Sequence, residues 1–195
     1  MSLYSQAGIK CRKGMSVVYT IPHVPWVPTR DDIINTLLKM LKPNANDVFM
    51  DLGCGDGRVV IAVAKKFKIR TVCIELRKEL VEKAKEAAAK EGVIDLITFI
   101  EDDFFKVRLP KATIVYMYLL TSVNQKLRPK LESELANGTI IITLDFPIPE
   151  WQPIHVIELP RAWQRTLYIY VKGYSDVGHA PQKEYEKLIR AKLSI

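Results

Sequence analysis

Acidic residues and glycines recur at fixed spacing in residues 48–58, which read VFMDLGCGDGR. An apolar run leads into Asp51, and glycines follow at positions 53, 55 and 57. Apolar residues then recur at helical spacing, so the stretch predicts a strand, a glycine-rich turn and a helix. Such a turn lets the backbone approach a ligand closely, and the helix N-terminus offers free N–H groups to polar atoms. Binding of a nucleotide-like ligand is the expected chemistry; a tight turn that holds no ligand is the alternative.

The glycine spacing argues against a dinucleotide. In the fingerprint G-x-G-x-x-G the third glycine would fall at position 58, which is Arg58 here. A second acid, Glu75, ends the apolar stretch 71–75. An acid at the end of the second strand of a doubly wound sheet accepts hydrogen bonds from ribose hydroxyls, so Glu75 is the expected ribose ligand. The alternative is a solvated acid that opens the next helix, where acids are favoured.

The D-x-G-x-G-x-G pattern resembles motif I of the seven-strand S-adenosylmethionine (SAM) methyltransferases. The resemblance implies SAM as the cofactor, held by the motif's acid and turn: Asp51, Gly53, Cys54, Gly55 and Gly57. In this family an acid just past the third strand meets the adenine amino group, and a neighbouring apolar residue covers the ring. Here the resemblance implies Asp103 and Phe104, with Asp102 as the next candidate. Loop acids and core aromatics would account for the same letters.

Two further stretches resemble a narrower family, PHVPWVPT at 22–29 and LLTSVN at 119–124. With motif I they resemble the archaeal seven-β-strand protein-lysine methyltransferases, which are related to the mitochondrial ATP-synthase c-subunit lysine methyltransferases. The likeness covers about residues 20–172. It implies transfer of methyl groups to lysine side chains of a protein by direct in-line displacement. It also implies that the proline-rich segment folds over the cofactor, with Trp26 and Thr29 at the site; Trp26 could instead staple the first helix to the sheet.

Aromatic residues gather at or just past the predicted fourth and fifth strands: Tyr116, Tyr118, Phe146 and Trp151. A narrow apolar channel beside a sulfonium would lower the pKa of an acceptor amine, so no dedicated general base is expected. Tyr118 and Asn124 are the predicted substrate-side residues, Asn124 offering its carbonyl to the amine, and Asp145 is predicted to attract the lysine. Alternatively, one tyrosine belongs to the core and Asn124 only begins a helix.

These residues require alternating strands and helices to position them. Thr29 is the predicted N-cap of a helix, with Asp32 as its capping-box acid. After motif I, a helix is predicted to end at about residue 67 and a strand to end at Glu75. Further strands are predicted at 96–100, 112–118 and 139–144, and further helices at 78–91 and 122–135. The stretches 153–159 and 164–172 predict an antiparallel pair at one sheet edge, and 181–193 a last amphipathic helix.

The expected fold class is therefore α/β, a Rossmann-like doubly wound seven-stranded sheet that is mainly parallel with an antiparallel edge hairpin. The expected organisation is an N-terminal extension at 1–20, a methyltransferase domain at 21–175 and a C-terminal helical extension at 176–195. The oligomeric state stays open.

Composition fits one soluble domain, with 195 residues, 48% of them hydrophobic and 26% charged. No apolar run reaches the ~18 residues of a membrane span, and no apolar leader follows the first basic residues, so a cytoplasmic protein without membrane association is expected. Cys11, Cys54 and Cys73 are widely spaced, as are the three histidines. Neither a metal site nor a disulfide framework is expected, and Cys73 is interpreted as a small core residue.

The net charge of +7 leaves an acidic partner such as nucleic acid possible. Enzymes that methylate an exocyclic amine of a base commonly carry an N/D-P-P-Y/F/W string after the fourth strand, where this chain reads YMYL at 116–119. RNA or DNA methylation is therefore a less favoured alternative to a protein substrate with an accessible lysine. A small-molecule methyltransferase and a non-enzymatic cofactor-binding module are the remaining alternatives.

Overall fold

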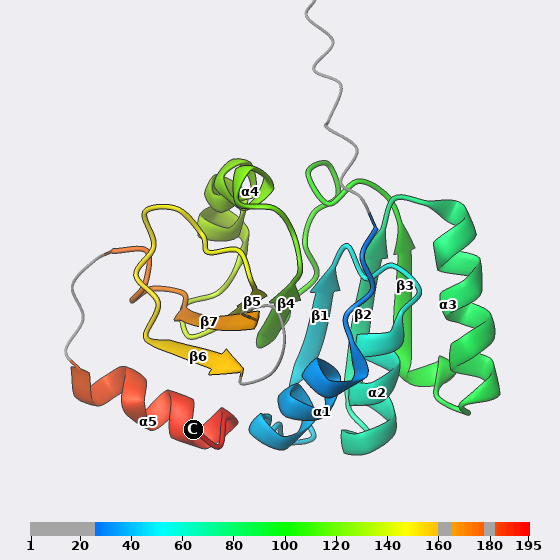
Figure 1. Ribbon diagram of the computed structural model, residues 1–195, viewed down its shortest axis with the longest axis horizontal. Coiled ribbons are helices and arrows are strands. Elements are labelled where there is room, and N and C mark those ends of the chain that lie inside the picture. The colour runs from blue at the N-terminus through cyan, green and yellow to red at the C-terminus, as the bar shows by residue number, and fades with distance from the viewer. Residues whose placement is uncertain (1–25, 160–164, 178–181) are drawn as a thin grey trace, which may run out of the picture.

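The computed structural model describes residues 26–159, 165–177 and 182–195 of the chain. They form one seven-stranded sheet in the order β3-β2-β1-β4-β5-β7-β6 (Figure 1). The strands are β1 (Val48–Leu52), β2 (Arg70–Glu75), β3 (Ile97–Glu101), β4 (Ile114–Met117), β5 (Ile140–Leu144), β6 (His155–Leu159) and β7 (Arg165–Val171). The helices are α1 (Asp31–Met40), α2 (Arg58–Phe67), α3 (Lys78–Lys90), α4 (Thr121–Glu134) and α5 (Gln182–Lys192), with a short 3₁₀ turn at Ile94–Leu96.

Strands β1 to β5 run parallel, and β7 is antiparallel to both β5 and β6. The predicted fold class and edge hairpin are thus confirmed. From β1, the chain adds β2 and β3 on one side of the sheet and β4 and β5 on the other. The place beside β1 where this direction reverses is the switch point, at which open α/β sheets bind ligands. In the register of the sheet, Asp51 lies between Cys73 on β2 and Tyr116 on β4.

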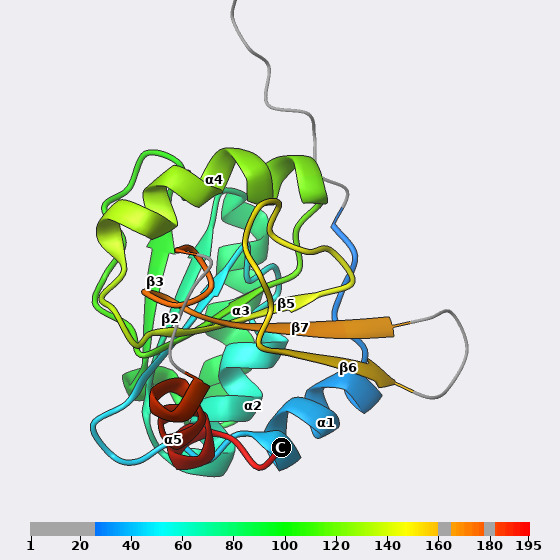
Figure 2. The same ribbon diagram turned by 90° about the vertical axis from the view of Figure 1, so that its left-hand side faces the viewer.

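Alternate residues of the strands supply two separate hydrophobic cores. Phe49, Cys73 and Ile114 pack on one face with α1, α2, α3 and α5, whereas Met50 and Val115 pack on the other face with α4. Figure 2 shows the sheet between α4 and the remaining helices. This burial on both faces explains why the parallel strands are apolar along nearly their whole length.

The predicted N-cap of α1 is wrong. The helix begins at Asp31, and its N-cap is Arg30, which makes no side-chain capping bond. Thr29 is buried, and its Oγ1 lies 3.2 Å from the hydroxyl of Tyr116. A tertiary hydrogen bond therefore replaces the local one, and Asp32 pairs with Arg30 instead of closing a capping box.

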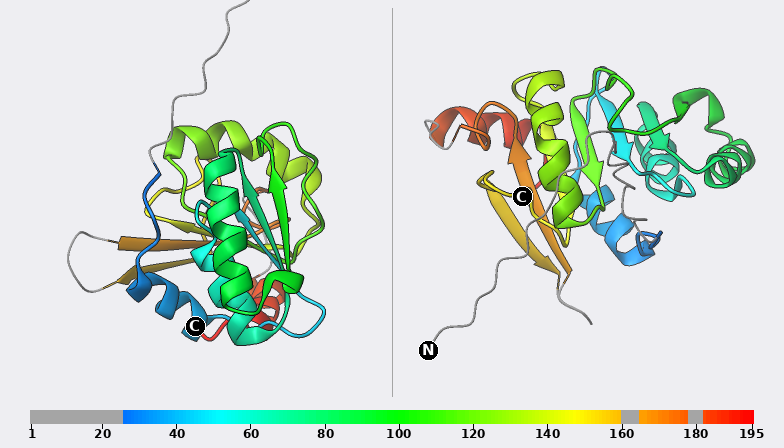
Figure 3. Two further views of the ribbon diagram at one scale, coloured as in Figure 1. Left: turned by 90° about the vertical axis from the view of Figure 1, so that its right-hand side faces the viewer. Right: turned by 90° about the horizontal axis from the view of Figure 1, so that it is seen from above.

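The C-terminal helix α5 closes the end of the sheet at which the parallel strands begin. Lys192 donates to both carboxylate oxygens of Asp47, which precedes β1, at 2.5 and 2.6 Å. Leu193 forms an antiparallel bridge with Leu41, so the C-terminus lies beside α1 (Figure 3). Within the described ranges, no helix combines the length and apolar character needed to cross a bilayer.

Candidate functional site

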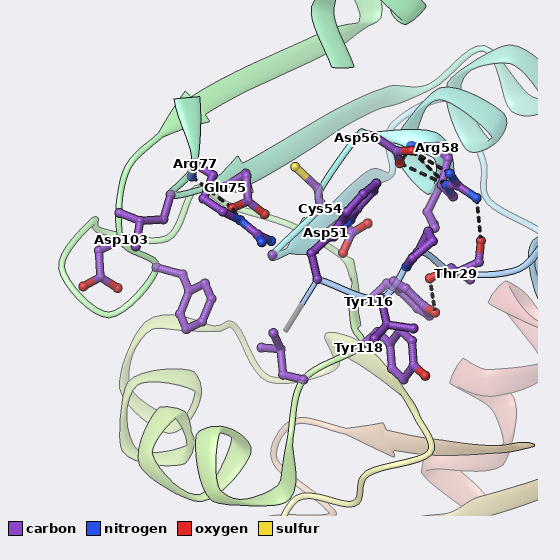
Figure 4. Close-up of a pocket in the computed structure, with 18 of the residues that line it drawn as sticks. Thr29, Asp51, Cys54, Asp56, Arg58, Glu75, Arg77, Asp103, Tyr116 and Tyr118 are labelled. Atoms are coloured by element: carbon purple, nitrogen blue, oxygen red, sulfur yellow. Dashed lines mark hydrogen bonds and ion pairs between the residues drawn. The ribbon is translucent and has the colours of Figure 1, made fainter. Parts of the chain in front are cut away.

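A pocket opens where β1, β2 and β4 end, at the switch point of the sheet (Figure 4). Its walls come from the segment before α1, the turn after β1, the ends of β2 and β4, and the loop after β3. Every position predicted to bind the cofactor except Gly55 and Gly57 is among its lining residues: Trp26, Thr29, Asp51, Gly53, Cys54, Glu75, Asp103 and Phe104. Residues from distant parts of the sequence therefore meet at one cavity.

The motif I turn has the predicted strand–turn–helix form. Amides of Gly53 and Cys54 donate to the carbonyl oxygen of Ile74 at 2.8 and 3.2 Å, which joins the turn to the end of β2. Gly55 has φ +57°, and a Cβ there would overlap the indole Nε1 of Trp26. A Cβ on Gly57 would lie 2.8 Å from the Cβ of Ala84 on α3. These two glycines shape the pocket through the close packing that they allow.

The expectation of no disulfide is wrong, because Cys54 and Cys73 are joined by one. Their Cα atoms lie 5.4 Å apart, within the range that a disulfide spans. Cys73 occupies β2 beside Asp51, and the turn carries Cys54 back over that strand. Sequence spacing could not reveal this pairing, because strand register brings the two residues together. The disulfide fixes the middle of the turn to β2.

Asp51 is 3% exposed and faces the pocket. Among the described residues, none donates a hydrogen bond to its carboxylate. Burial, with the nearby charges of Glu75 and Asp56, raises the pKa of Asp51 well above its usual value. A cation that entered the pocket would compensate this buried acid.

Glu75 is also buried, so it is not a solvated acid at the start of a helix. One carboxylate oxygen accepts from the amide of Gly55 at 3.0 Å, and the other accepts from the amide and the Nε of Arg77 at 3.0 and 3.1 Å. The turn and the end of β2 thus hold a fixed carboxylate at the pocket wall.

The loop after β3 presents Asp103 and Phe104 to the pocket, whereas Asp102 is exposed and is not among the lining residues. Asp103 Oδ1 accepts from the amide of Phe105 at 2.9 Å, which holds the loop in shape. Asp102 instead accepts from the amide of Asp103 at 2.7 Å. Of the two candidate acids in this loop, the structure brings only Asp103 to the site.

Leu76 and Arg58 are among the lining residues that sequence reasoning missed. Leu76 directly follows Glu75, lines the pocket and is 59% exposed, which is unusual for a leucine. Arg58 pairs with Asp56 at 2.6 Å and donates to the carbonyl oxygen of Thr29 at 3.3 Å. The hydrogen bonds of Asp56 raise the pKa of Arg58. Leu76 could have been found from the sequence, because it is an apolar residue between an acid and the charged start of α3. No sequence signal connected Arg58 with Thr29.

Residues 26–29 lie against the pocket rather than between α1 and the sheet. The indole of Trp26 rests on Gly55 and is 40% exposed, which favours a wall of the pocket over a staple of the first helix. Thr29 joins this segment to β4 through Tyr116. Pro22 and Pro25 of the predicted segment lie outside the described residues.

Of the four aromatic residues predicted near the acceptor, Tyr116 and Tyr118 line the pocket, whereas Phe146 and Trp151 do not. Tyr118 lines the pocket, and its ring stacks with that of Phe146 at 6.2 Å between centroids. Tyr116 lies deeper, and burial raises the pKa of its hydroxyl. Trp151 is buried in the core with α4, where its Nε1 donates to Glu132, so it is not part of the site.

Asn124 and Asp145 are engaged inside the fold. Asn124 is fully buried, and its Nδ2 donates to the carbonyl oxygens of Phe146 at 3.0 Å and Pro147 at 3.3 Å. It lies in the first turn of α4 and is not among the pocket-lining residues. Asp145 pairs with Arg165 at 2.5 Å and accepts from the amide of Thr166 at 3.0 Å. The Oδ1 of Asn124 is buried and accepts no hydrogen bond from the described residues, but Asn124 does not line the pocket. Both carboxylate oxygens of Asp145 are engaged.

The part of the chain that the structure describes contains no cluster of His, Cys, Asp and Glu suited to a metal ion. The site offers instead two buried carboxylates, an acidic loop residue, an exposed leucine and several aromatic rings around one cavity. This arrangement suits an organic ligand with cationic and hydroxyl groups at different positions along its length.

Comparison with known proteins agrees with this arrangement. The ANTKMT methyltransferase domain matches residues 51–155. The protein-lysine N-methyltransferase of Saccharolobus islandicus is 39% identical over 78% of this chain and 96% of its own length. The human ATP synthase c-subunit lysine N-methyltransferase is 35% identical over 68% of this chain, which spans 56% of that relative.

A solved structure is also similar. It is described as an RNA methyltransferase from Salinibacter ruber in complex with S-adenosyl-L-homocysteine. It shares 37% sequence identity with this chain, covers 80% of it and 97% of its own chain, and superposes with a TM-score of 0.71.

Proposed function

This chain belongs to the ANTKMT family of SAM-dependent methyltransferases, and we propose that it methylates lysine side chains of a protein substrate. The observation that carries the proposal is the 39% identity with an archaeal protein-lysine N-methyltransferase across 96% of that relative. Fold alone would not support a substrate class, because this fold serves many methyl acceptors.

The pocket suits SAM. Asp51 is a buried carboxylate to which no described residue donates a hydrogen bond, and the α-ammonium of SAM is a cation of the required charge. The fixed carboxylate of Glu75 supports a role in binding the ribose hydroxyls. Asp103 would accept from the adenine amino group, with Phe104 and Leu76 as apolar surfaces for the ring.

When bound, SAM supplies a methyl group activated by a sulfonium: the acceptor nitrogen forms the N–C bond while the S–C bond breaks and sulfur keeps that electron pair. The task of the chain is therefore to hold a neutral amine in line with the methyl group, and such positioning is worth several kcal/mol, up to about 7–11 in ideal cases. The ring of Tyr118, supported by that of Phe146, provides an apolar wall for that purpose. The described lining of the pocket contains no histidine that could serve as a base, so the lysine would lose its proton to water as it enters.

One observation favours a second candidate, methylation of RNA. The similar structure from Salinibacter ruber is described as an RNA methyltransferase and shares 37% identity over nearly its whole chain. The positive net charge of this chain is compatible with such a partner.

The test is transfer of a labelled methyl group from SAM into a cell extract, with the products divided by protease and nuclease treatment. We expect label that is lost only to protease and that appears as methyl-lysine after acid hydrolysis. Label lost to nuclease would contradict the lysine proposal and support RNA.

Two variants serve as controls. Asp51→Asn removes the charge proposed to bind SAM and should abolish transfer, whereas Asp47→Asn changes an equally buried aspartate at the opposite end of β1 and should retain it. Equal loss in both variants would indicate a folding defect rather than a loss of cofactor binding.

A further inference from the structure

Behind Tyr118, which lines the pocket, lies an ion pair that the proposed function does not use. Arg165, the first residue of β7, donates through Nη1 to the hydroxyl of Tyr118 and to Oδ2 of Asp145. Its guanidinium lies over the Tyr118 ring, with Cζ 5.5 Å from the ring centroid. The side chains of Arg165 and Asp145 are 21% and 16% exposed, so the pair is largely shielded from water.

Asp145 is held in place from several sides. It directly follows β5 and has φ +62°, a left-handed conformation that Asp tolerates better than most residues. Its backbone amide donates to the carbonyl oxygen of Thr166 at 2.7 Å, and its Oδ1 accepts from the amide of Thr166 at 3.0 Å. Because Oδ2 binds Arg165, both oxygens are engaged and the carboxylate offers no uncompensated charge to an acceptor.

The two tyrosines of this region differ in their partners. The hydroxyl of Tyr116 is buried against Thr29, inside the fold. The hydroxyl of Tyr118 is joined to a cation, and its ring forms part of the pocket wall. Both tyrosines line the pocket, and Arg165 acts on Tyr118, the less buried of the two.

We infer that Arg165 is a positioning residue for the methyl acceptor, an inference that rests on the proposed lysine methylation. It holds Tyr118 in the wall of the acceptor channel, and it cancels the charge of Asp145. Without the guanidinium, that carboxylate would stabilise lysine as an ammonium ion, which has no lone pair to attack the methyl group. Arg165 thus keeps the acceptor end neutral, so that lysine is held as the reactive free amine.

Other charged groups around this end have partners of their own. Arg58 of α2 is paired with Asp56, and Asp51 of β1 is proposed to receive the ammonium group of SAM. On the neighbouring strand β6, Glu158 is exposed and stands opposite Thr166. Burial raises the pKa of the Tyr116 hydroxyl, and the nearby charges of Asp51 and Asp145 add to the rise. Of these charged groups, the Arg165–Asp145 pair is the one that contacts Tyr118 directly.

The experiment compares the wild type with Arg165→Met, Arg165→Lys, Asp145→Asn and the double variant Arg165→Met/Asp145→Asn. Protein from a heat-treated cell extract is the acceptor probe, and the initial rate of labelled methyl-lysine formation is measured from pH 6 to pH 10. SAM affinity and melting temperature are measured for each variant. Arg190→Met, an exposed arginine on α5, is the matched control.

For Arg165→Met we expect kcat at pH 7 to fall roughly 10- to 100-fold and the acid limb of the pH–rate profile to move upward by about one pH unit, with SAM affinity and the KM for acceptor protein nearly unchanged. The double variant should restore the position of the profile but not the full rate, because Tyr118 remains unsupported. Arg165→Lys should keep the wild-type profile, since it retains the charge.

An Arg165→Met profile with the wild-type shape, or a shift that persists in the double variant, would overturn the inference while leaving the proposed function intact. Failure of the wild-type enzyme to form methyl-lysine would overturn both. Because a structural defect would lower the melting temperature and would not be corrected by Asp145→Asn, the melting temperature and the double variant separate positioning from simple loss of folded protein.

Discussion

Two buried aspartates mark opposite ends of strand β1, and their surroundings differ completely. Asp47, just before the strand, is 2% exposed and accepts from Lys192 at 2.5 and 2.6 Å and from the amide of Asn44 at 2.7 Å. Burial alone would raise its pKa, but these hydrogen bonds hold the pKa of Asp47 below its usual value. Asp51 is 3% exposed, has no hydrogen-bond donor among the described residues, and has a pKa raised by burial.

The comparison shows that burial does not by itself decide the role of an acid. At the start of the strands the chain supplies its own cation, 145 positions away in sequence, and α5 completes the structure there. At the carboxyl ends no described residue supplies a cation to Asp51, and Glu75 and Asp56 add negative charge. An unpaired buried carboxylate destabilises the fold unless a ligand compensates it, so this end of the sheet is completed only by a cation from outside the chain.

The largest effect should come from removing the charge of Asp51. Asp51→Asn should weaken SAM binding about 10- to 150-fold, because a hydrogen bond to a charged group is worth roughly 1.5–3 kcal/mol, and the buried setting favours the upper end. Titration calorimetry measures this, with Asp47→Asn as the control that keeps wild-type affinity. An affinity of Asp51→Asn within about threefold of the wild type would contradict the assignment.

The wild-type affinity should also depend on pH. Since the pKa of Asp51 is raised, the carboxyl group is protonated at low pH and must lose its proton to bind a cation. SAM affinity should therefore rise with pH until pH exceeds that pKa, and Asp51→Asn should remove this dependence. A rise of equal size in the variant would assign the dependence to another group.

The disulfide Cys54–Cys73 should stabilise the ligand end by about 3 kcal/mol, the chain-entropy estimate for a closed loop of this length. Reduction, or the double variant Cys54→Ala/Cys73→Ala, should lower the melting temperature by roughly 6–12 °C. Cys11→Ser, outside the described residues, is the control and should change nothing. Wild-type protein that melts at the same temperature with and without reductant would show that the bond contributes no stability.

At the end of the sheet where β1 begins, Lys192→Met should lower the free energy of unfolding by about 2 kcal/mol. This loss is smaller than the loss expected for a fully buried ion pair, because the lysine side chain is 20% exposed. The pKa of Asp47 is depressed in the folded state, so its stabilisation is present above the unfolded value of about 3.9 and is lost as pH falls through the folded value. Urea unfolding at several pH values should show a smaller acid dependence in Lys192→Met. SAM affinity should stay unchanged, because this pair lies far from the pocket.

Sequence reasoning predicted what depends on local pattern. The glycine spacing, the acids at positions 51 and 75 and the alternation of strands and helices predicted the sheet and its ligand-binding end, whereas the family resemblance supplied Trp26, Thr29, Asp103 and Phe104. Such features follow from periodicity and turn chemistry within short windows.

What sequence reasoning missed depends on register and on long-range contacts. Cys73 meets Cys54 because β2 lies beside β1, and Lys192 meets Asp47 because α5 returns to the start of the sheet. Thr29 satisfied the local rule for an N-cap, yet it forms a hydrogen bond with Tyr116 on a strand 87 residues away. Arg165 had no neighbour in sequence that revealed its pairing with Asp145.

A smaller effect concerns stability without ligand. Asp51→Asn should stabilise the SAM-free protein by about 1–2 kcal/mol at neutral pH, because it removes a buried unpaired charge. The sign follows from the raised folded pKa of Asp51: wild-type stability falls as pH rises from the unfolded value of about 3.9 through the folded one, and the variant lacks this decline. Melting curves without SAM test it, and a destabilised variant at neutral pH would contradict the comparison of the two aspartates.

The smallest effect separates the two interpretations of Thr29. If its hydroxyl served as an N-cap, Thr29→Asp would preserve or improve the start of α1, since Asp is a good capping residue. The structure predicts the reverse: Asp would place a carboxylate beside Tyr116, close to Asp51, and add to the negative charge already present at the ligand end. Thr29→Ser should retain wild-type stability, Thr29→Val should lose about 0.5–1 kcal/mol for one hydrogen bond, and Thr29→Asp should lose more. Melting temperatures in the order Ser, Val, Asp would support the tertiary bond, whereas an Asp variant equal to Ser would restore the N-cap.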